Sequence, residues 1–167
     1  LLWEYFGWKE KMPQWAHFPL ILKPDGQGKL SKRDGDRLGF PVFAMDWLDP
    51  KTGEKTKGFK EMGFLPEAFI NMLAMLGWND GSGKEIFTKE ELIEHFSVER
   101  IHKGGAKFDF EKAKWYNHEW IKSANDNKLI PLVKNLLHEN GIASDDQKLK
   151  NIIPITRSEE HTSELQS

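Results

Sequence analysis

The sequence predicts a short α/β segment followed by a mainly α-helical chain. An apolar run at residues 19–22 stops at Lys23-Pro24 and a glycine-rich turn, which is typical of a short buried strand. Strand-like runs flank the turn residues 49–53, which indicates a hairpin. From residue 61 onward, apolar residues recur at helical spacing between start and stop signals. The 167 residues fit about one domain of ordinary size.

Residues 1–40 are predicted to close an α/β unit. Residues 1–6 are apolar and predict the last turns of a helix, which Gly7 ends. The strand at residues 19–22 then leads into Asp25-Gly26-Gln27-Gly28, where glycine allows a tight change of direction.

Residues 41–60 are predicted to form a β-hairpin. Residues 41–47 are strand-like, residues 49–53 have the composition of a turn, and residues 55–59 can return as the second strand. Three apolar side chains of the first strand are expected to pack rather than to contact a partner: Val42, Phe43 and Trp47.

A helix is predicted after residue 65. Pro66 and Glu67 suit its first turn, and Gly77 is the expected stop. Its apolar residues fall on one stripe, which we expect to face the core: Leu65, Phe69, Met72, Leu73 and Leu76.

Four further helices are indicated by their caps. Thr88 and Glu91 form a capping box for a helix to about Phe96, and Asp109 is the expected N-cap of a helix through residues 111–116. A helix over residues 127–140 is closed by Gly141, and a capping box at residues 144–147 starts the last one. Apolar residues at helical spacing support these last two: Leu129, Leu132, Val133, Leu136, Leu137, Leu149, Ile152 and Ile153.

The composition excludes several kinds of site. The chain contains no cysteine, so it has neither disulfides nor thiolate metal sites. Its six histidines lack the spacing of metal ligands, so we expect no metal site. No run of 18 apolar residues is present, so no membrane-spanning helix is predicted.

The strongest candidate site is the run Lys29-Leu30-Ser31-Lys32-Arg33. It places three cations and a hydroxyl directly after the glycine turn. Taken alone, such a run is most often a solvated loop. After a strand and a glycine turn, however, its backbone amides and mobile cations suit a polyphosphate. The alternating charges of residues 32–37 are expected to hold these cations in place.

The run resembles the KMSKS-type signature of class I aminoacyl-tRNA synthetases, in the form used by glutamyl-tRNA synthetases. Other segments resemble the same family in the same order: residues 15–22, the GFLPEA helix start at residues 63–68, and residues 76–78, 85–88 and 114–117. The resemblance covers roughly residues 1–156. Several ordered motifs are more specific than the basic run alone.

The resemblance implies a division of the chain. Residues 1–60 would be the C-terminal end of a Rossmann-type catalytic domain with the signature loop and a hairpin insertion. Residues 61–124 would be a helical stem-contact region, and residues 125–156 the start of a helical anticodon-binding domain.

The resemblance also implies a reaction and roles for the cations. Glutamate would attack the α-phosphate of ATP, and the glutamyl-adenylate would then pass its acyl group to tRNA(Glu). Lys32 matches the ATP-contacting lysine of the signature, and Lys29 matches its supporting lysine. Ser31 would donate to a phosphate oxygen or hold the loop, and Arg33 would contact the ATP phosphates beside Lys32.

The implied partners are glutamate, ATP and tRNA(Glu). Mg²⁺ would arrive with ATP, and no residue of this chain is identified as its ligand. We expect a cytoplasmic enzyme that does not contact a membrane and is a monomer at full length.

A second stretch, residues 103–120, interleaves aromatic and cationic side chains. Such a pattern can stack on bases and hold phosphates, so four residues are candidates for tRNA contact: Lys103, Lys107, Lys114 and Trp115. The alternative is that Trp115 and Trp120 anchor the core among solvated lysines.

Both ends of the chain suggest an incomplete protein. The chain starts Leu1-Leu2-Trp3, and the His-x-Gly-His element of the family does not occur in it. We therefore expect an internal fragment that is inactive alone. Residues 157–167 resemble a translated sequencing adapter, and we expect them not to be native. They carry one arginine and three glutamates, so removing them changes the net charge from −2 to 0 and disfavours generic polyanion binding.

Four alternatives stay open at this point. One is glutaminyl-tRNA synthetase, which the helices after residue 61 disfavour, since that family usually continues as a β-barrel. Another is a glutamyl enzyme that also charges glutamine tRNA. The third is the truncated relative that modifies an anticodon base, and the helices at residues 127–153 disfavour it. The last is a non-catalytic RNA-binding module, which the near-neutral charge disfavours.

Overall fold

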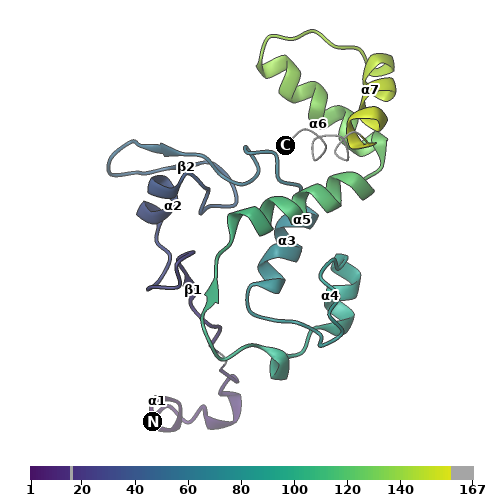
Figure 1. Cartoon of the computed structure of the whole chain (residues 1–167). Coiled ribbons are helices and arrows are strands. Elements are labelled where there is room, and N and C mark those ends of the chain that lie inside the picture. The colour runs from purple at the N-terminus through teal and green to yellow at the C-terminus, as the bar shows by residue number, and fades with distance from the viewer. Residues whose placement is uncertain (16, 159–167) are drawn as a thin grey trace.

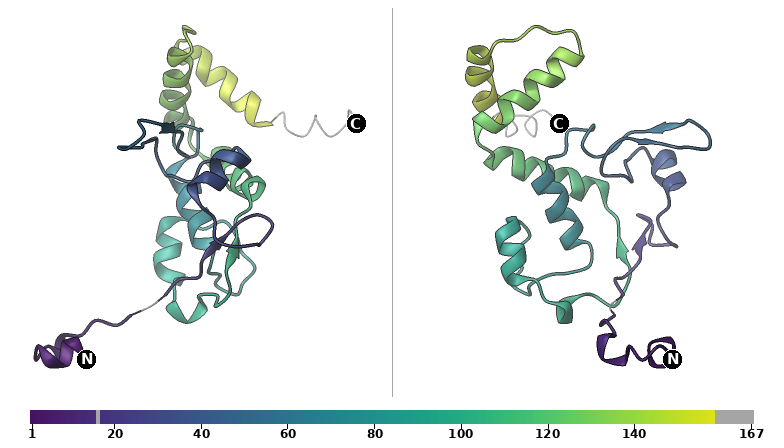
Figure 2. Two further views of the ribbon diagram at one scale, coloured as in Figure 1. Left: turned by 90° about the vertical axis from the view of Figure 1, so that its left-hand side faces the viewer. Right: turned by 180° about the vertical axis from the view of Figure 1, so that it is seen from behind.

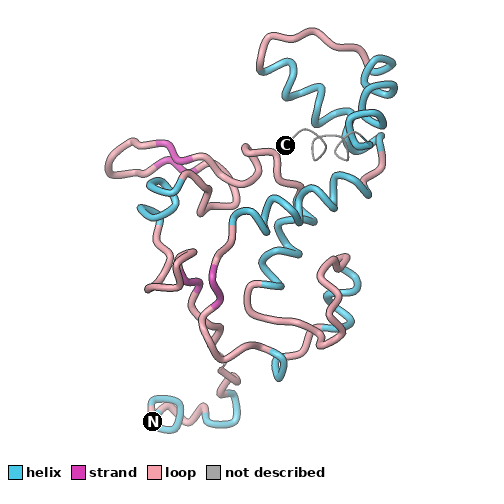
Figure 3. Tube along the Cα trace, viewed as in Figure 1, coloured by secondary structure: helices cyan, strands magenta, loops and turns pink. Residues whose placement is uncertain are grey.

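Helices predominate in the computed structural model, which describes residues 1–15 and 17–158 but not the side chains of residues 156–158 (Figures 1 and 3). The helices are α1 (Leu2–Tyr5), η1 (Lys9–Lys11), α2 (Lys32–Leu38), α3 (Pro66–Met75), α4 (Lys89–His95), η2 (Val98–Arg100), α5 (Phe110–Ser123), α6 (Asp126–Glu139) and α7 (Asp146–Ser158), where η marks a 3-10 helix. The strands are β1 (Ile21–Leu22), β2 (Trp47–Leu48), β3 (Lys55–Thr56) and β4 (Ala106–Lys107). The expected adapter tail lies outside the described residues, apart from the backbone of residues 157 and 158.

The elements form an elongated molecule. Helices α3 and α5 pack together at its centre, α6 and α7 pair at one end, and α1 lies at the opposite end (Figures 1 and 2). Among the described residues, no helix combines the length and the apolar character that a membrane crossing requires.

Strand β1 pairs in parallel with β4, with Leu22 opposite Lys107. The pairing joins the segment before the cationic run to the segment before α5. The expectation of a buried strand at residues 19–22 is wrong in part, because Leu20 and Ile21 are exposed. The sheet has only two strands among the described residues, so the apolar side chains of β1 have little to pack against.

The predicted hairpin is present but shorter than expected. Only β2 and β3 are paired, antiparallel, and residues 41–46 are not a strand. The base of the hairpin is instead closed by backbone bonds from Phe59 and Lys60 to the carbonyls of Phe43 and Ala44 (2.9 and 3.0 Å). Gly58 lies so close to the facing chain that a Cβ would stand 2.1 Å from a backbone carbon, and only glycine fits there.

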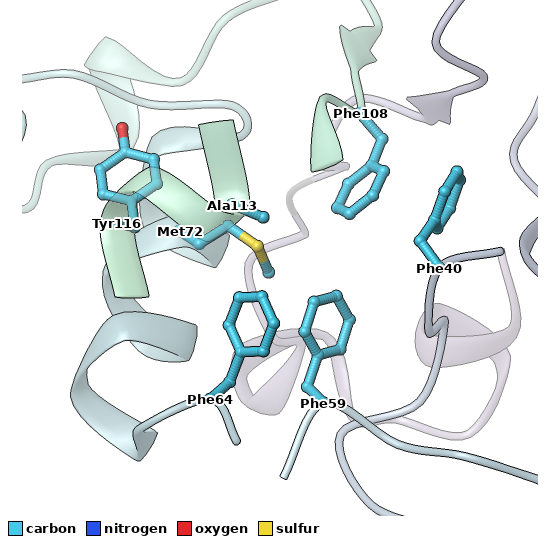
Figure 4. Close-up of a cluster of buried hydrophobic side chains, with 7 residues drawn as sticks. All are labelled: Phe40, Phe59, Phe64, Met72, Phe108, Ala113 and Tyr116. Carbon is cyan, nitrogen blue, oxygen red and sulfur yellow. The ribbon is translucent and has the colours of Figure 1, made fainter. Parts of the chain in front are cut away.

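One buried cluster joins the hairpin to the central helices (Figure 4). Its members are Phe40, Phe59, Phe64, Met72, Phe108, Ala113 and Tyr116. The aromatic rings meet at centroid distances of 4.9 Å for both the Phe40–Phe108 and the Phe59–Phe64 pairs. The expected division at residue 60 therefore runs through a shared core.

Helix α3 starts at Pro66 as expected, but its buried face differs from the predicted stripe. Leu73 is exposed, and Asn71 is fully buried in its place. Helix α3 ends at Met75 with Leu76 as its C-cap, so Gly77 follows the helix end as expected, although its φ is not positive. Its missing side chain instead lets Pro19 approach: a Cβ on Gly77 would stand 3.0 Å from the Pro19 ring.

The caps of α4 and α5 are confirmed. Thr88 and Glu91 form the predicted capping box, and the Asp109 carboxylate accepts from the Lys112 N–H (3.0 Å). Helix α5 extends to Ser123, well beyond the predicted residues 111–116.

Helices α6 and α7 form a second buried cluster with the start of α3. Its members are Leu65, Ala68, Leu129, Ile130, Leu149 and Ile153. The predicted stripes are wrong in part, since Leu132, Leu136 and Ile152 are exposed. The last cap is shifted by one residue: the Asp145 carboxylate, rather than Ser144, accepts from the Lys148 N–H (2.8 Å).

Candidate nucleotide-binding site

A tight loop leads from β1 into the cationic run. The Lys23 N–H donates to the Gly28 carbonyl (3.1 Å), and the Leu30 N–H donates to the Ile21 carbonyl (2.8 Å). Gly26 and Gly28 have φ angles of 80° and 84°, which glycine adopts without strain. The predicted glycine turn therefore lies directly before the cations.

Ser31 begins α2 with a capping box. Its hydroxyl donates to the Asp34 carboxylate (2.5 Å), its N–H donates to the same oxygen (3.1 Å), and its hydroxyl oxygen faces the Asp34 N–H. The bond from the Ser31 hydroxyl is the main cause that holds the pKa of Asp34 below its usual value. Two roles were expected for Ser31, and its bonds to Asp34 match the one in which it holds the segment in place. Lys32 and Arg33 lie in the first turn of α2.

The cations of the run differ in their partners. Lys32 Nζ lies 3.5 Å from an Asp49 carboxylate oxygen in the turn of the hairpin. Lys29 and Arg33 form no ion pair with the residues that the structure describes. The expectation that residues 32–37 hold their own cations is correct for Arg37, which pairs with Asp34 (3.5 Å), and wrong for Lys32 and Arg33.

Lys107 lies against the glycine turn. A Cβ on Gly26 would stand 2.5 Å from the Lys107 Cε, so the Lys107 side chain passes directly over this glycine. The parallel pairing of β1 and β4 brings it there. Lys107, one of the four candidate RNA contacts, therefore lies over the turn that precedes the cationic run. The two segments are far apart in the sequence, so this contact could not be predicted from it.

The other three candidate RNA contacts lie just before β4 and on α5. Lys103 is exposed before β4, and Lys114 is exposed and paired with Glu111 at 2.7 Å. Trp115 is 37% exposed, so it does not anchor the core. Its ring instead receives the Lys112 ammonium at 4.0 Å from the centroid.

Two aromatic residues of the same stretch are structural. Tyr116 lies in the first buried cluster, and burial raises the pKa of its hydroxyl to about 12. The Trp120 indole N–H donates to the Asn71 side-chain oxygen (3.1 Å). The core-anchor alternative thus holds for Trp120.

Two contributors to these surfaces were missed in the sequence. Asp49 was assigned only to turn formation, and Lys112, which also pairs with Glu85 at 2.6 Å, was counted among the interleaved cations but not among the candidate RNA contacts. The only local signal for Asp49 was its position at the start of a turn, which says nothing about a distant lysine. Among the described residues, no group of three or more His, Asp or Glu side chains could hold a metal ion.

The sequence of this chain matches a known protein family over most of its length. Residues 1–115 match the family described as tRNA synthetases class I (E and Q), catalytic domain. The match spans most of the chain, and the chain belongs to this family of class I tRNA synthetases. The resemblance drawn from the cationic run is confirmed.

Two similar proteins carry the name glutamate–tRNA ligase. The chain is 49% identical over 157 residues to glutamate–tRNA ligase of Porphyromonas gingivalis and 52% identical over 157 residues to that of Phocaeicola vulgatus. Each alignment covers 94% of this chain and 31% of the relative, so the chain spans about a third of their length.

A solved structure shows the same fold. The crystal structure of a glutamate tRNA ligase from Elizabethkingia meningosepticum, in complex with its amino acid, matches with a TM-score of 0.85 and 46% identity. The match covers 93% of this chain and 31% of that one.

Proposed function

We propose that the chain is the part of a glutamate–tRNA ligase that carries the phosphate-binding loop. The whole enzyme would use ATP to form glutamyl-adenylate and would then attach glutamate to tRNA(Glu). The observation that carries the proposal is the run at residues 29–33, set between a glycine turn and α2 in a chain of the class I family. The activity would belong to the whole protein, since this chain spans only about a third of the length of the relatives that it matches.

The run supplies positive charge where the reaction develops negative charge. Formation of the adenylate releases pyrophosphate, and a cation that meets this charge in the transition state lowers the barrier. We assign Lys32 to this role and Lys29 to its support. Arg33 contacts the phosphates from the first turn of α2, and Ser31 fixes that turn through its bonds to Asp34.

Mg²⁺ would enter as the counter-ion of ATP and would supply charge neutralisation on the phosphates. The described residues include no cluster that fits it.

The RNA-facing surface is proposed to use Lys103, Lys107, Lys114 and Trp115. Three of these side chains are exposed cations, and the partly exposed Trp115 ring lies beside the Lys112 ammonium. Aromatic and cationic groups side by side can stack on a base and neutralise its phosphate. Lys107 would join this surface to the phosphate loop through its position over Gly26.

The finer domain division is part of the same proposal. Residues 1–60 would end a Rossmann-type catalytic domain, residues 61–124 would contact the tRNA stem, and residues 125–156 would begin the anticodon-binding domain. The break between α5 and α6 at residues 124–125 supports the second boundary. The whole enzyme would be a cytoplasmic monomer, and residues 157–167 would be adapter-derived.

The glutamyl assignment is favoured over the glutaminyl one. The matched family includes both specificities, so the choice depends on the relatives and on the helices. The similar proteins described above are glutamate–tRNA ligases, and the described residues beyond 61 are mainly helical, with helices α3 to α7 and the two-residue strand β4.

Aminoacylation by the full-length protein tests the proposal. With ATP and purified tRNA, we expect attachment of glutamate to tRNA(Glu) and none of glutamine to either tRNA. Glutamate on both tRNA(Glu) and tRNA(Gln) would instead indicate the non-discriminating enzyme. RNA binding without any aminoacylation would overturn the proposal in favour of a binding module.

A further inference from the structure

The hairpin insertion contacts the cationic run through one ion pair. Lys32 Nζ and Asp49 Oδ2 lie 3.5 Å apart, and the two side chains are only 26% and 28% exposed. The hairpin lies beside α2 in Figure 1 and in the two further views of Figure 2. The insertion therefore places an acidic group on the lysine that is assigned to the phosphates.

The turn of the hairpin holds the Asp49 carboxylate in place. Its Oδ1 accepts from the N–H groups of Lys51 (2.8 Å) and Thr52 (3.2 Å). These donors, the Lys51 N–H first, hold the pKa of Asp49 below its usual value, and the nearby Lys32 charge adds to this. Asp49 is thus an ionised group whose second oxygen, Oδ2, faces Lys32.

Packing positions both partners of the ion pair. Gly58 donates to Asp46 at the base of the hairpin (3.0 Å), and the adjacent Phe59 is buried in the first cluster. On the other side, a Cβ on Gly35 of α2 would stand 2.2 Å from a Val42 methyl group, so α2 and the base of the hairpin are in direct contact. The packing of α2 and of the hairpin base therefore positions the Lys32 and Asp49 side chains next to each other.

The carboxylate of Asp34, which caps α2, is already engaged. Asp34 accepts from Ser31 and pairs with Lys23 (3.6 Å) and Arg37 (3.5 Å). Lys32 is left to Asp49, whereas Lys29 and Arg33 have no acidic partner among the described residues.

We propose that Asp49 is a positioning residue that competes with the phosphates of ATP for the Lys32 ammonium. The inference depends on the proposed role of Lys32 in ATP binding. A lysine ammonium is a single compact charge on a flexible stem, so it must leave Asp49 to reach a phosphate. Breaking the pair offsets part of the new contact, which keeps ATP affinity moderate and leaves Lys32 to act mainly in the transition state.

The test is Asp49→Asn in the full-length enzyme. The Asn side-chain oxygen can still accept from Lys51 and Thr52, so the turn is preserved while the charge on Lys32 is removed. We expect the Kd of Mg-ATP, measured by calorimetry, to fall about two- to fivefold, the range for a partly exposed pair. The same substitution in a Lys32→Ala background should leave the Kd unchanged.

Asp46→Asn is the matched control. It removes the same charge from the same hairpin, but Asp46 pairs with Lys55 (2.7 Å) and not with Lys32. We expect no change in the Kd of Mg-ATP. Asp49→Ser, whose hydroxyl can also accept from the turn, repeats the test if Asn disturbs the hairpin.

Three results would overturn the inference: an unchanged Kd in Asp49→Asn, an equal fall in Asp46→Asn, or an equal fall in the Lys32→Ala background. The failure of the proposed function looks different. If the unsubstituted enzyme catalyses glutamate-dependent exchange that Lys32→Ala abolishes, the function stands and only the role of Asp49 is rejected. If the unsubstituted enzyme does not bind ATP, both are rejected.

Discussion

At the scale of single residues, Asn71 joins three parts of the helical region. It is fully buried on α3, and its side chain donates to the Glu85 carbonyl (2.8 Å). Its side-chain oxygen accepts from the Phe87 N–H (2.9 Å) and from the Trp120 indole (3.1 Å). A buried amide whose nitrogen and oxygen both have hydrogen-bond partners favours one arrangement of the elements that it connects.

Replacing Asn71 is therefore expected to be costly. Asn71→Ala leaves the buried Phe87 N–H and the part-buried Glu85 carbonyl and Trp120 indole N–H without partners. We expect the free energy of unfolding to fall by about 2–4 kcal/mol. Urea unfolding of the full-length protein, followed by tryptophan fluorescence, measures it. The control Asn127→Ala, at an exposed position of α6, should change stability by less than about 0.5 kcal/mol. Equal effects of the two substitutions would contradict the role of Asn71.

At the scale of elements, α2 and the hairpin depend on a close approach at Gly35. Glycine inside an exposed helix normally lowers stability relative to alanine. Here the Phe40 carbonyl and a Val42 methyl group would stand 2.9 and 2.2 Å from an added Cβ. Gly35 thus lets α2 pack closely against residues 40–42.

Gly35→Ala should separate α2 from the hairpin, although alanine is the better helix former. We expect a loss of about 1–3 kcal/mol from overpacking. Hydrogen exchange in the full-length protein should show it as faster exchange of the Phe59 and Lys60 amides, which close the base of the hairpin. Gly104→Ala has open space around it and should leave these amides unchanged. Slower exchange in Gly35→Ala would contradict the packing assignment.

At the scale of the whole molecule, local signals predicted most of the helices but missed α2, since the cationic run was expected to be a loop and instead starts a helix. The capping box at Thr88, the Asp109 cap and the Gly141 stop were all correct, because each depends on a few neighbouring residues. The glycine turn and the cationic run were identified for the same reason. The family resemblance was confirmed because several such segments occur in order.

The long-range arrangement could not be predicted in the same way. Leu73 and Leu136 fit a helical stripe but face solvent, because burial depends on which helices pack together. The position of Lys107 over Gly26 follows from strand pairing, and the Lys32–Asp49 pair follows from the fold of the hairpin. Both contacts join residues whose separation in sequence hides them.

Glutamate-dependent ATP–pyrophosphate exchange by the full-length Lys32→Ala enzyme tests the central claim most directly. Loss of a charge that acts in the transition state should lower kcat by an amount equivalent to roughly 2–4 kcal/mol, with little change in ATP affinity. Lys51→Ala, which removes an exposed lysine from the same hairpin, should leave exchange unchanged. Unchanged exchange in Lys32→Ala would contradict the assignment of this run to the phosphates of ATP.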